Sequence, residues 1–327
     1  MLQILDVAVE KWPIAGHFAI ARGSRTEAEV VVVHIRAGDH VGRGESVPYA
    51  RYGESVPATV AAIRAMSDAI AAGLSRDALL HAMPAGAARN AIDCALFDLE
   101  AKTTGRTAAE IAGVPPLRPA ETAFTLSLGT PEAMAAAARA AAARPLLKVK
   151  LGGEGDAARI AAVRAAASDA RLIVDANEAW REASLVENIA ACAAAGVELI
   201  EQPLPAAEDG ALEGYASPIP LCADESLHTR AELDACARRY TVVNVKLDKT
   251  GGLTAALAVS AEARRLGFRI MVGCMVGTSL AMAPALVLAR DADFVDLDGP
   301  LLLARAREPG LRYEGSLVYP PPPALWG

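Results

Sequence analysis

One unit repeats along the chain from about residue 121 to residue 300: a short aliphatic and β-branched run ending in a polar or charged residue, then an alanine-rich helical stretch. Apolar strands that alternate with helices are typical of a parallel sheet buried on both faces. Eight such runs, roughly 25 residues apart, favour a closed (β/α)8 barrel of the TIM type over an open sheet. The helix after Pro203 is short, so we expect one incomplete unit. The runs are TAFTLSLG (122–129), LLKVKLG (146–152), LIVDAN (172–177), LIEQPL (199–204), LCADES (221–226), VVNVKLD (242–248), RIMVGC (269–274) and FVDLDG (294–299).

The first part of the chain has a different pattern, which predicts an α+β capping domain over residues 1–118. Two antiparallel strands and two helices are predicted there, at residues 2–10, 30–36, 58–74 and 87–102. Two polar or glycine-containing connections, 16–26 and 42–53, could reach over a neighbouring barrel mouth. We expect the barrel to cover residues 119–304 and the tail, 305–327, to pack back on the capping domain.

Charge and cysteine usage narrow the range of partners and compartments. The net charge is −7 and no basic block occurs, which argues against nucleic acid and against an anionic membrane surface. The uncharged stretch 270–289 contains Gly273, Gly277 and Pro284, so it predicts a strand, a loop and a helix, not a membrane span. Five scattered cysteines and a start without a basic signal-peptide region indicate a cytoplasmic protein. A homo-oligomer is possible.

Charged residues gather at the ends of the predicted strands. In a (β/α)8 barrel the carboxyl ends of the strands face the mouth, where catalytic groups lie. Residues two apart on a strand point to the same side, so Lys148 and Lys150 both face inward, and so do Asp296 and Asp298. The strand-end set is Lys148, Lys150, Asp175, Glu201, Asp224, Lys246, Asp296 and Asp298.

Three carboxylates close consecutive strands: Asp175, Glu201 and Asp224. Converging carboxylates repel one another unless a cation lies between them, whereas separate solvated strand-end acids would need none. All three are hard oxygen ligands, which suit Mg²⁺ better than Zn²⁺. The pattern predicts one Mg²⁺ per subunit, with coordination positions left for water or a substrate carboxylate.

Two lysines end the second and sixth strands, roughly opposite each other in an eight-strand circle. Lys150 and Lys246 could each be a surface lysine, but a buried lysine near cations can lose its proton and act as a base. Lys148 would supply such a neighbouring charge to Lys150. An opposed pair across a metal-bound substrate is what a 1,1-proton transfer requires, because one lysine removes a proton from carbon and the other returns one to the opposite face.

These motifs resemble the enolase superfamily, in its muconate-lactonizing-enzyme subgroup. The resemblance covers nearly the whole chain and implies a barrel with an N-terminal cap, Mg²⁺ bound to the three acids, and a lysine base on each of strands two and six; sites of this superfamily are a known example of Mg²⁺-assisted enediolate chemistry. The motifs are KVK (148–150), VDANEAW (174–180), EQPLP (201–205), ADES (223–226), NVKLDKTGG (244–252) and DLDGP (296–300).

Within the subgroup, DLDGP resembles the D-x-D motif of dipeptide epimerases such as the L-Ala-D/L-Glu epimerases. The resemblance implies that Asp296 and Asp298 hold the substrate's α-ammonium group, as two inward carboxylates away from the metal need a cation. The stretch FAIARGSRTEA (18–28) is similar to the capping loop of those enzymes, which places Arg25, more than Arg22, at the acidic side chain of the second residue. Thr125 is a further expected contact. The implied enzyme is an isomerase of L-Ala-L/D-Glu with a role in cell-wall peptide metabolism.

Three other interpretations stay open at the level of sequence. Muconate cycloisomerisation or o-succinylbenzoate synthesis belongs to the same subgroup, but those substrates lack an ammonium group for Asp296 and Asp298. A non-catalytic binding barrel would be expected to have lost at least one lysine or acid. A Schiff-base aldolase would use a lysine but leaves the three carboxylates unexplained.

Overall fold

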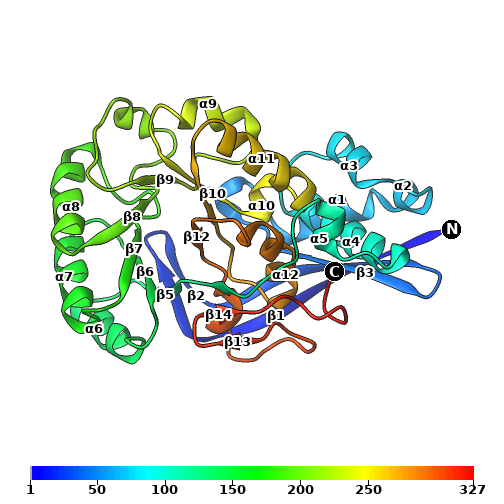
Figure 1. Ribbon diagram of the computed structural model, residues 1–327, viewed down its shortest axis with the longest axis horizontal. Helices are drawn as coiled ribbons and strands as arrows, with labels where there is room; N and C mark the ends of the chain where they lie inside the picture. Colours follow the sequence, from blue (N-terminus) through cyan, green and yellow to red (C-terminus); the bar gives the residue numbers. More distant parts are fainter. Residues whose placement is uncertain (1) are drawn as a thin grey trace.

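The computed structural model describes residues 2–327, and its larger part is a parallel barrel (Figure 1). Eight strands follow one another in chain order around the sheet. The two edges meet where the Ala123 N–H donates to the Val295 carbonyl at 2.8 Å, so the sheet closes on itself. The predicted (β/α)8-type fold with an α+β cap is confirmed. The strands are β5 (Phe124–Leu126), β6 (Leu146–Lys150), β7 (Arg171–Asp175), β8 (Val197–Glu201), β9 (Leu221–Ala223), β10 (Val242–Val245), β11 (Arg269–Val272) and β12 (Phe294–Val295).

Two barrel units lack a full α-helix, whereas the sequence predicted only one incomplete unit. After β8 the chain forms only a short 3₁₀ turn, Asp209–Leu212, and after β12 another, Gly299–Leu302. Buried Asp209 stabilises the first of these segments by accepting hydrogen bonds from Ser226 and Tyr240 at 2.6 and 2.9 Å. The outer helices are α6 (Pro131–Ala140), α7 (Asp156–Ala166), α8 (Glu182–Ala194), α9 (Leu233–Cys236), α10 (Leu247–Thr250), α11 (Leu253–Arg265) and α12 (Ser279–Ala289).

The barrel interior is built in layers because strand side chains alternate between the two faces. An apolar layer takes one residue from each strand or the position just before it: Ala123, Leu146, Ile173, Leu199, Cys222, Val242, Met271 and Phe294. Two residues further along each strand lies a polar layer: Thr125, Lys148, Asp175, Glu201, Asp224, Asn244, Gly273 and Asp296. The apolar layer therefore forms a water-excluding floor beneath the charged groups.

The N-terminal part is an antiparallel sheet covered by helices. The predicted pairing of its first two strands is confirmed, with Val7 opposite Val33. The predicted single helix over 58–74 is wrong: it divides after Arg64, whose carbonyl accepts a hydrogen bond from the Ser67 hydroxyl at 2.7 Å. The elements are β1 (Gln3–Ile20), β2 (Gly23–Ala37), β3 (His40–Ser46), α1 (Val56–Arg64), α2 (Ser67–Ala71), α3 (Arg76–Ala82), α4 (Ala87–Thr104) and α5 (Ala108–Ala112).

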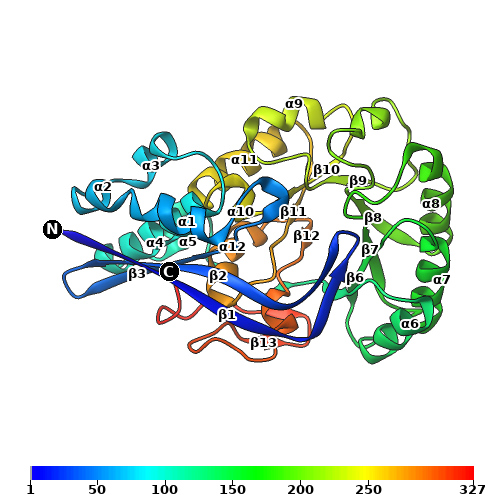
Figure 2. The same cartoon turned by 180° about the vertical axis from the view of Figure 1, so that it is seen from behind.

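The first predicted connection, 16–26, is largely strand, whereas the second, 42–53, is strand only as far as Ser46 and then a loop. Residues 16–26 form the tip of the β1–β2 hairpin, which reaches across to the barrel in both views (Figures 1 and 2). The Leu128 N–H donates to the Ala19 carbonyl at 3.0 Å and ties this tip to the barrel mouth. Gly42 belongs to β3, where a Cβ atom would lie 2.1 Å from the Ala95 carbonyl oxygen of α4. That glycine marks close packing between helix and strand, not a turn.

The C-terminal tail returns to the N-terminal part of the molecule. Strands β13 (Tyr313–Glu314) and β14 (Leu317–Val318) form a small sheet with β4 (Ala120–Glu121). Further on, Trp326 is fully buried, its ring centroid lies 5.9 Å from that of Phe97, and its indole N–H donates to the Cys94 carbonyl at 3.0 Å. Residues 1–118 and 119–304 remain the proposed capping and barrel domains. In the part of the chain that the structure describes, each helix is too short or too polar to cross a membrane.

Candidate active site

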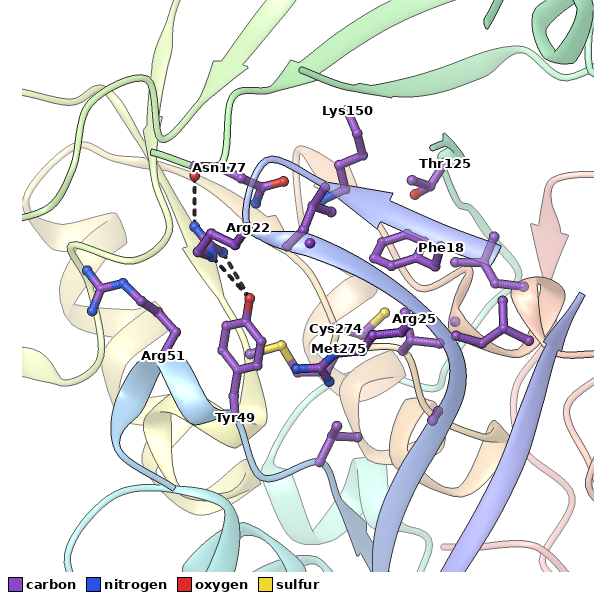
Figure 3. Close-up of a pocket in the computed structure, with 18 of the residues that line it drawn as sticks. Phe18, Arg22, Arg25, Tyr49, Arg51, Thr125, Lys150, Asn177, Cys274 and Met275 are labelled. Atoms are coloured by element: carbon purple, nitrogen blue, oxygen red, sulfur yellow. Dashed lines mark hydrogen bonds between the residues drawn. The ribbon is translucent and has the colours of Figure 1, made fainter. Parts of the chain in front are cut away.

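A cavity of about 470 Å³ lies between the hairpin tip, the loop 47–55 and the carboxyl ends of the barrel strands (Figure 3). Its volume falls in the range of small-molecule sites. The predicted site residues on its wall are Arg25, Thr125, Lys148, Lys150, Asp224, Lys246, Asp296 and Asp298. Asp175 and Glu201 do not line the wall; both are buried in the polar layer beside it.

Asp175 and Glu201 are neutralised by the two lysines of β6. The Lys150 Nζ lies 2.6 Å from Asp175 Oδ2, and the Lys148 Nζ lies 2.6 Å from Glu201 Oε2. Burial would raise the pKa of Asp175, but Lys150 and Lys148 hold it below its ordinary value. Burial and then the charge of Asp175 raise the pKa of Glu201. The two carboxylates therefore differ in proton affinity although they are neighbours.

Asp224 lies between two lysines. Lys246, just after β10, donates to Asp224 Oδ2, and Lys249 on α10 donates to Oδ1, both at 2.6 Å. Burial opposes ionisation of Asp224, yet Lys246 and Lys249 lower its pKa well below the ordinary value. Burial alone would lower the pKa of Lys246, but Asp224 and Glu201 raise it well above its usual range. Lys246 is accordingly a protonated ammonium group in this state.

The two proposed bases stand on opposite sides of the barrel. Lys150 ends β6 and Lys246 follows β10, four strands further round an eight-stranded sheet. Phe18 of the hairpin covers Lys150, with the Nζ 5.8 Å from the ring centroid. The side chains of both lysines are less than one-tenth exposed. A substrate in the cavity would thus have one ammonium or amine group on each side.

The two acids of the D-x-D motif have one cationic partner between them among the described residues, Lys148. Lys148 donates to Asp296 Oδ2 at 2.7 Å, but Asp296 Oδ1 is buried and accepts no hydrogen bond from any residue in 2–327. The Thr125 backbone N–H donates to Asp298 Oδ2 at 2.6 Å. Burial and the neighbouring charge of Asp296 raise the pKa of Asp298 to about 7. This pair is arranged to receive a cationic group from the cavity.

The two arginines of the hairpin tip differ in their surroundings. Arg22 donates to Glu225 at 2.6 Å and to Glu178 at 3.1 Å, and Figure 3 shows its bonds to Asn177 and Tyr49. Arg25 lines the cavity and has no ion-pair partner in the described chain; its guanidinium lies 5.6 Å from the centroid of the Tyr49 ring. Arg22 therefore fastens the tip to the barrel, and Arg25 is left to meet a ligand.

Sequence reasoning missed several groups at the site. Lys249 and Asn244 bond to the predicted acids, and Glu178 and Glu225 anchor Arg22. Asn244 could have been found, because it precedes Lys246 by two residues and so shares its inward face. Contacts made by Glu178 depend on the distant hairpin tip, and the local sequence carries no signal for them.

Comparisons with known proteins agree with this geometry. Residues 4–113 match the model of the mandelate racemase/muconate lactonizing enzyme N-terminal domain, and residues 132–299 match that of the enolase C-terminal domain-like family. The L-Ala-D/L-Glu epimerase of Escherichia coli K12 is 48% identical, over 95% of this chain and 98% of that protein. An N-acetyl-D-glutamate racemase of a Pseudoalteromonas species is also 48% identical, over 91% and 95%.

A solved structure is similar over the whole fold. It is an enolase family member from Agrobacterium tumefaciens, described as having homology to dipeptide epimerases and as containing bound sodium and L-Ala-L-Glu with an ordered loop. It is 54% identical, covers 99% of this chain and 100% of its own, and superposes with a TM-score of 0.98. With both family models matched and relatives of this identity along almost its full length, the chain belongs to the mandelate racemase/muconate lactonizing enzyme family of the enolase superfamily.

Proposed function

We propose that this protein is a dipeptide epimerase that inverts the α-carbon of the second residue in L-Ala-L-Glu and L-Ala-D-Glu. The observation that carries the proposal is the opposed pair Lys150 and Lys246 at a cavity that also holds Asp296, one of whose carboxylate oxygens has no partner among residues 2–327. The lysines supply a two-base proton transfer, and the free oxygen supplies a partner for the dipeptide's ammonium group. The similar E. coli epimerase supports the same assignment.

The proposed reaction moves one proton off the α-carbon and another onto it. The Nζ of one lysine, as the neutral amine, takes the α-proton, and the ammonium group of the other gives a proton to the opposite face, so the configuration inverts and the two lysines exchange protonation states without net change in composition. The apolar layer below the site excludes water, which strengthens every charge interaction within it. Both lysines must exchange their present carboxylate partners for the substrate during this cycle.

The residues present fit one Mg²⁺ ion on Asp175, Glu201 and Asp224. All offer hard carboxylate oxygens from consecutive strands, and buried Glu201 Oε2 accepts no well-directed hydrogen bond within residues 2–327. The same residues form no ready-made cage of three acids, because each carboxylate is drawn to a lysine. When bound, the ion would neutralise the charge that develops on the substrate carboxylate as the α-proton leaves.

Both ends of the dipeptide have candidate partners. We assign the α-ammonium group to Asp296 and Asp298, because Asp296 Oδ1 accepts no hydrogen bond from residues 2–327 and both acids line the cavity. We assign the side-chain carboxylate of the second residue to Arg25, which lines the cavity without an ion-pair partner in the described structure. Thr125 orients Asp298 through its backbone N–H. Charge-assisted bonds of this kind contribute about 1.5–3 kcal/mol each.

The test is isotope exchange in D₂O. L-Ala-L-Glu incubated with the protein and Mg²⁺ should gain deuterium at the glutamate α-carbon and give both epimers, and chelation of Mg²⁺ should stop both processes. Mass spectrometry measures the label and chiral chromatography the epimers. Absence of label from a range of dipeptides would contradict the proposal.

Racemisation of an N-acylated glutamate is the second candidate, favoured by the similarity to the Pseudoalteromonas racemase. N-acetylglutamate has the same reacting α-carbon, carboxylate and acidic side chain, but it lacks the ammonium group. Asp296 and Asp298 would then face a neutral acetyl group, and the same holds for cycloisomerase-type substrates. Comparable kcat/KM values for N-acetyl-D-glutamate and L-Ala-D-Glu would remove the argument for the dipeptide.

We also propose a cytoplasmic location. All five cysteines are free thiols, and four of them are buried. Unpaired cysteines persist in reducing compartments. Immunodetection in fractionated cells would test this placement.

A further inference from the structure

The two carboxylate oxygens of Glu201 have different surroundings. Asn244, a fully buried residue of β10, donates its side-chain N–H to Glu201 Oε1 at 2.7 Å. Oε2 lies 2.6 Å from the Lys148 Nζ but accepts no well-directed hydrogen bond from the described residues. Gly273 leaves room for the amide, because a Cβ there would lie 2.6 Å from Asn244 Oδ1. Turning the amide over would set an oxygen against the carboxylate, so its orientation is fixed.

The two carboxylate oxygens of Asp224 also have different partners. Lys249 has a fully buried side chain, and its Nζ donates to Asp224 Oδ1 at 2.6 Å, to the Asn244 carbonyl at 2.9 Å and to the Asp224 carbonyl. These three bonds use all the protons of the ammonium group, so Lys249 has none to give to a substrate. Asp224 Oδ2 is left to Lys246, which borders the cavity.

Asp175 completes the pattern with a backbone donor. Its Oδ1 accepts the Asn177 N–H at 2.9 Å, while Oδ2 lies 2.6 Å from the Lys150 Nζ. Asn177 has a φ of 45°, a left-handed conformation that asparagine tolerates better than most residues. In all three acids, one oxygen is bound by a group outside the proposed chemistry, and the other faces a lysine of the ring.

We propose that Asn244 and Lys249 are positioning residues for the cation held by the three acids. By binding one oxygen of Glu201 and of Asp224, they leave the other oxygen as the one that can coordinate. The inference rests on the proposed metal assignment. Partners of this kind typically change metal affinity by about 10–100-fold. The positive charge of Lys249 alone would repel a cation, so at a pH where Asp224 is ionised with or without Lys249, any favourable effect of this lysine on cation binding must come from orientation.

The experiment measures Mn²⁺ affinity of the free protein by electron paramagnetic resonance, without substrate. Mn²⁺ takes the same hard oxygen ligands as Mg²⁺ and is visible to the method. Asn244→Ala, which changes no charge, should weaken binding by about 10–100-fold. Lys249→Met should also weaken it, although loss of the charge alone would tighten binding. Lys102→Met is the matched control: Lys102 bridges Asp98 and the Val41 carbonyl at 2.6 and 3.0 Å, away from the cavity.

Four outcomes decide the question. Weaker binding in both variants, with the affinity of Lys102→Met unchanged, supports the positioning role. Unchanged affinity in Asn244→Ala, or unchanged or tighter binding in folded Lys249→Met, overturns that role for the residue concerned. Asp175→Asn tests the metal assignment separately from the positioning role. If the three acids hold the ion, this variant should not bind Mn²⁺. If Asp175→Asn binds like the unaltered protein, the metal assignment fails and the inference with it. Thermal melts of each variant establish folding, and Asn244→Ala tests the pattern even if Lys249→Met does not fold.

Discussion

Lys150 and Lys246 each contact a different acid, so single substitutions separate their contributions. We expect Lys150→Met and Lys246→Met each to lower epimerisation by about 10²–10⁴-fold, the usual effect of losing a positioned acid–base group. Each variant should still exchange the α-proton of the one epimer whose proton faces the remaining lysine. Deuterium uptake by L-Ala-L-Glu and L-Ala-D-Glu, followed separately, measures this asymmetry. Equal loss of exchange for both epimers in both variants would rule out the two-base scheme.

Asp298 gives the site a pH dependence. Burial and Asp296 raise its pKa to about 7, so in the free protein it is protonated below that pH. The dipeptide ammonium group pairs with the ionised form, and binding must then displace a proton. KM should therefore rise about tenfold per pH unit below 7 and level off above it. Asp298→Asn should show a high KM that is flat across this range; a wild-type KM independent of pH would contradict the ammonium role.

Asp298 also makes the stability of the folded protein depend on pH, but here it is high pH, not low pH, that is unfavourable. The pKa of Asp298 is about 7 in the folded protein, against 3.8 ordinarily, so the folded state binds the proton more tightly. Its contribution is fully present below pH 4 and is lost as pH rises through 7, by roughly 4 kcal/mol. Asp298→Asn should then be more stable than the unaltered protein at pH 8. Denaturant titrations at pH 5 and pH 8 measure the difference, and an identical pH slope in both proteins would count against it.

Among the structural elements, the β1–β2 hairpin is fastened to the barrel by the ion pairs of Arg22 and by the backbone bond between Leu128 and Ala19. Arg22→Met would leave Glu178 and Glu225 buried without this partner, so the tip should open more often. We expect faster amide hydrogen exchange over residues 16–26 and a higher KM for every dipeptide. Arg25→Met is the control: it should leave exchange unchanged and raise KM for L-Ala-L-Glu far more than for a dipeptide with a neutral second residue. The reverse pattern would exchange the roles of the two arginines.

The helices and strands that could be predicted from sequence are those whose position follows from the local spacing of apolar residues. The inward parity of Lys148, Lys150, Asp296 and Asp298 follows from strand alternation alone. The hairpin tip was not predictable, because its Gly16 and Gly23 are typical of loops, although the two strands pair through to Ile20 and Gly23. Nor could the sequence pair each acid with its lysine: Asp175 bonds to Lys150 and Asp224 to Lys246 across neighbouring strands, but strand alternation places every one of these side chains inward and does not select the partners.

At the scale of the whole molecule, the end of the tail at Trp326 acts as a stabilising element on helix α4. Trp326→Ala removes a fully buried side chain and its hydrogen bond to Cys94, so unfolding free energy should fall by about 3–5 kcal/mol. Leu317→Ala, at a side chain that is 41% exposed, should change it by no more than about 0.5 kcal/mol. Thermal and urea unfolding measure both. Folded Trp326→Ala should keep its kcat at low temperature; a loss there would assign the tail a role in catalysis.

The position of Trp326 also sets the order in which the molecule can mature on the ribosome. Synthesis proceeds from the N-terminus at about 5–20 residues per second, and early domains usually fold as they emerge. Here the helix that carries Cys94 and Phe97 is made early, but Trp326, which packs on it, lies 232 residues after Cys94 in the chain. This part of the core, although its helix is made early, must therefore wait until residue 326 has emerged before it is complete.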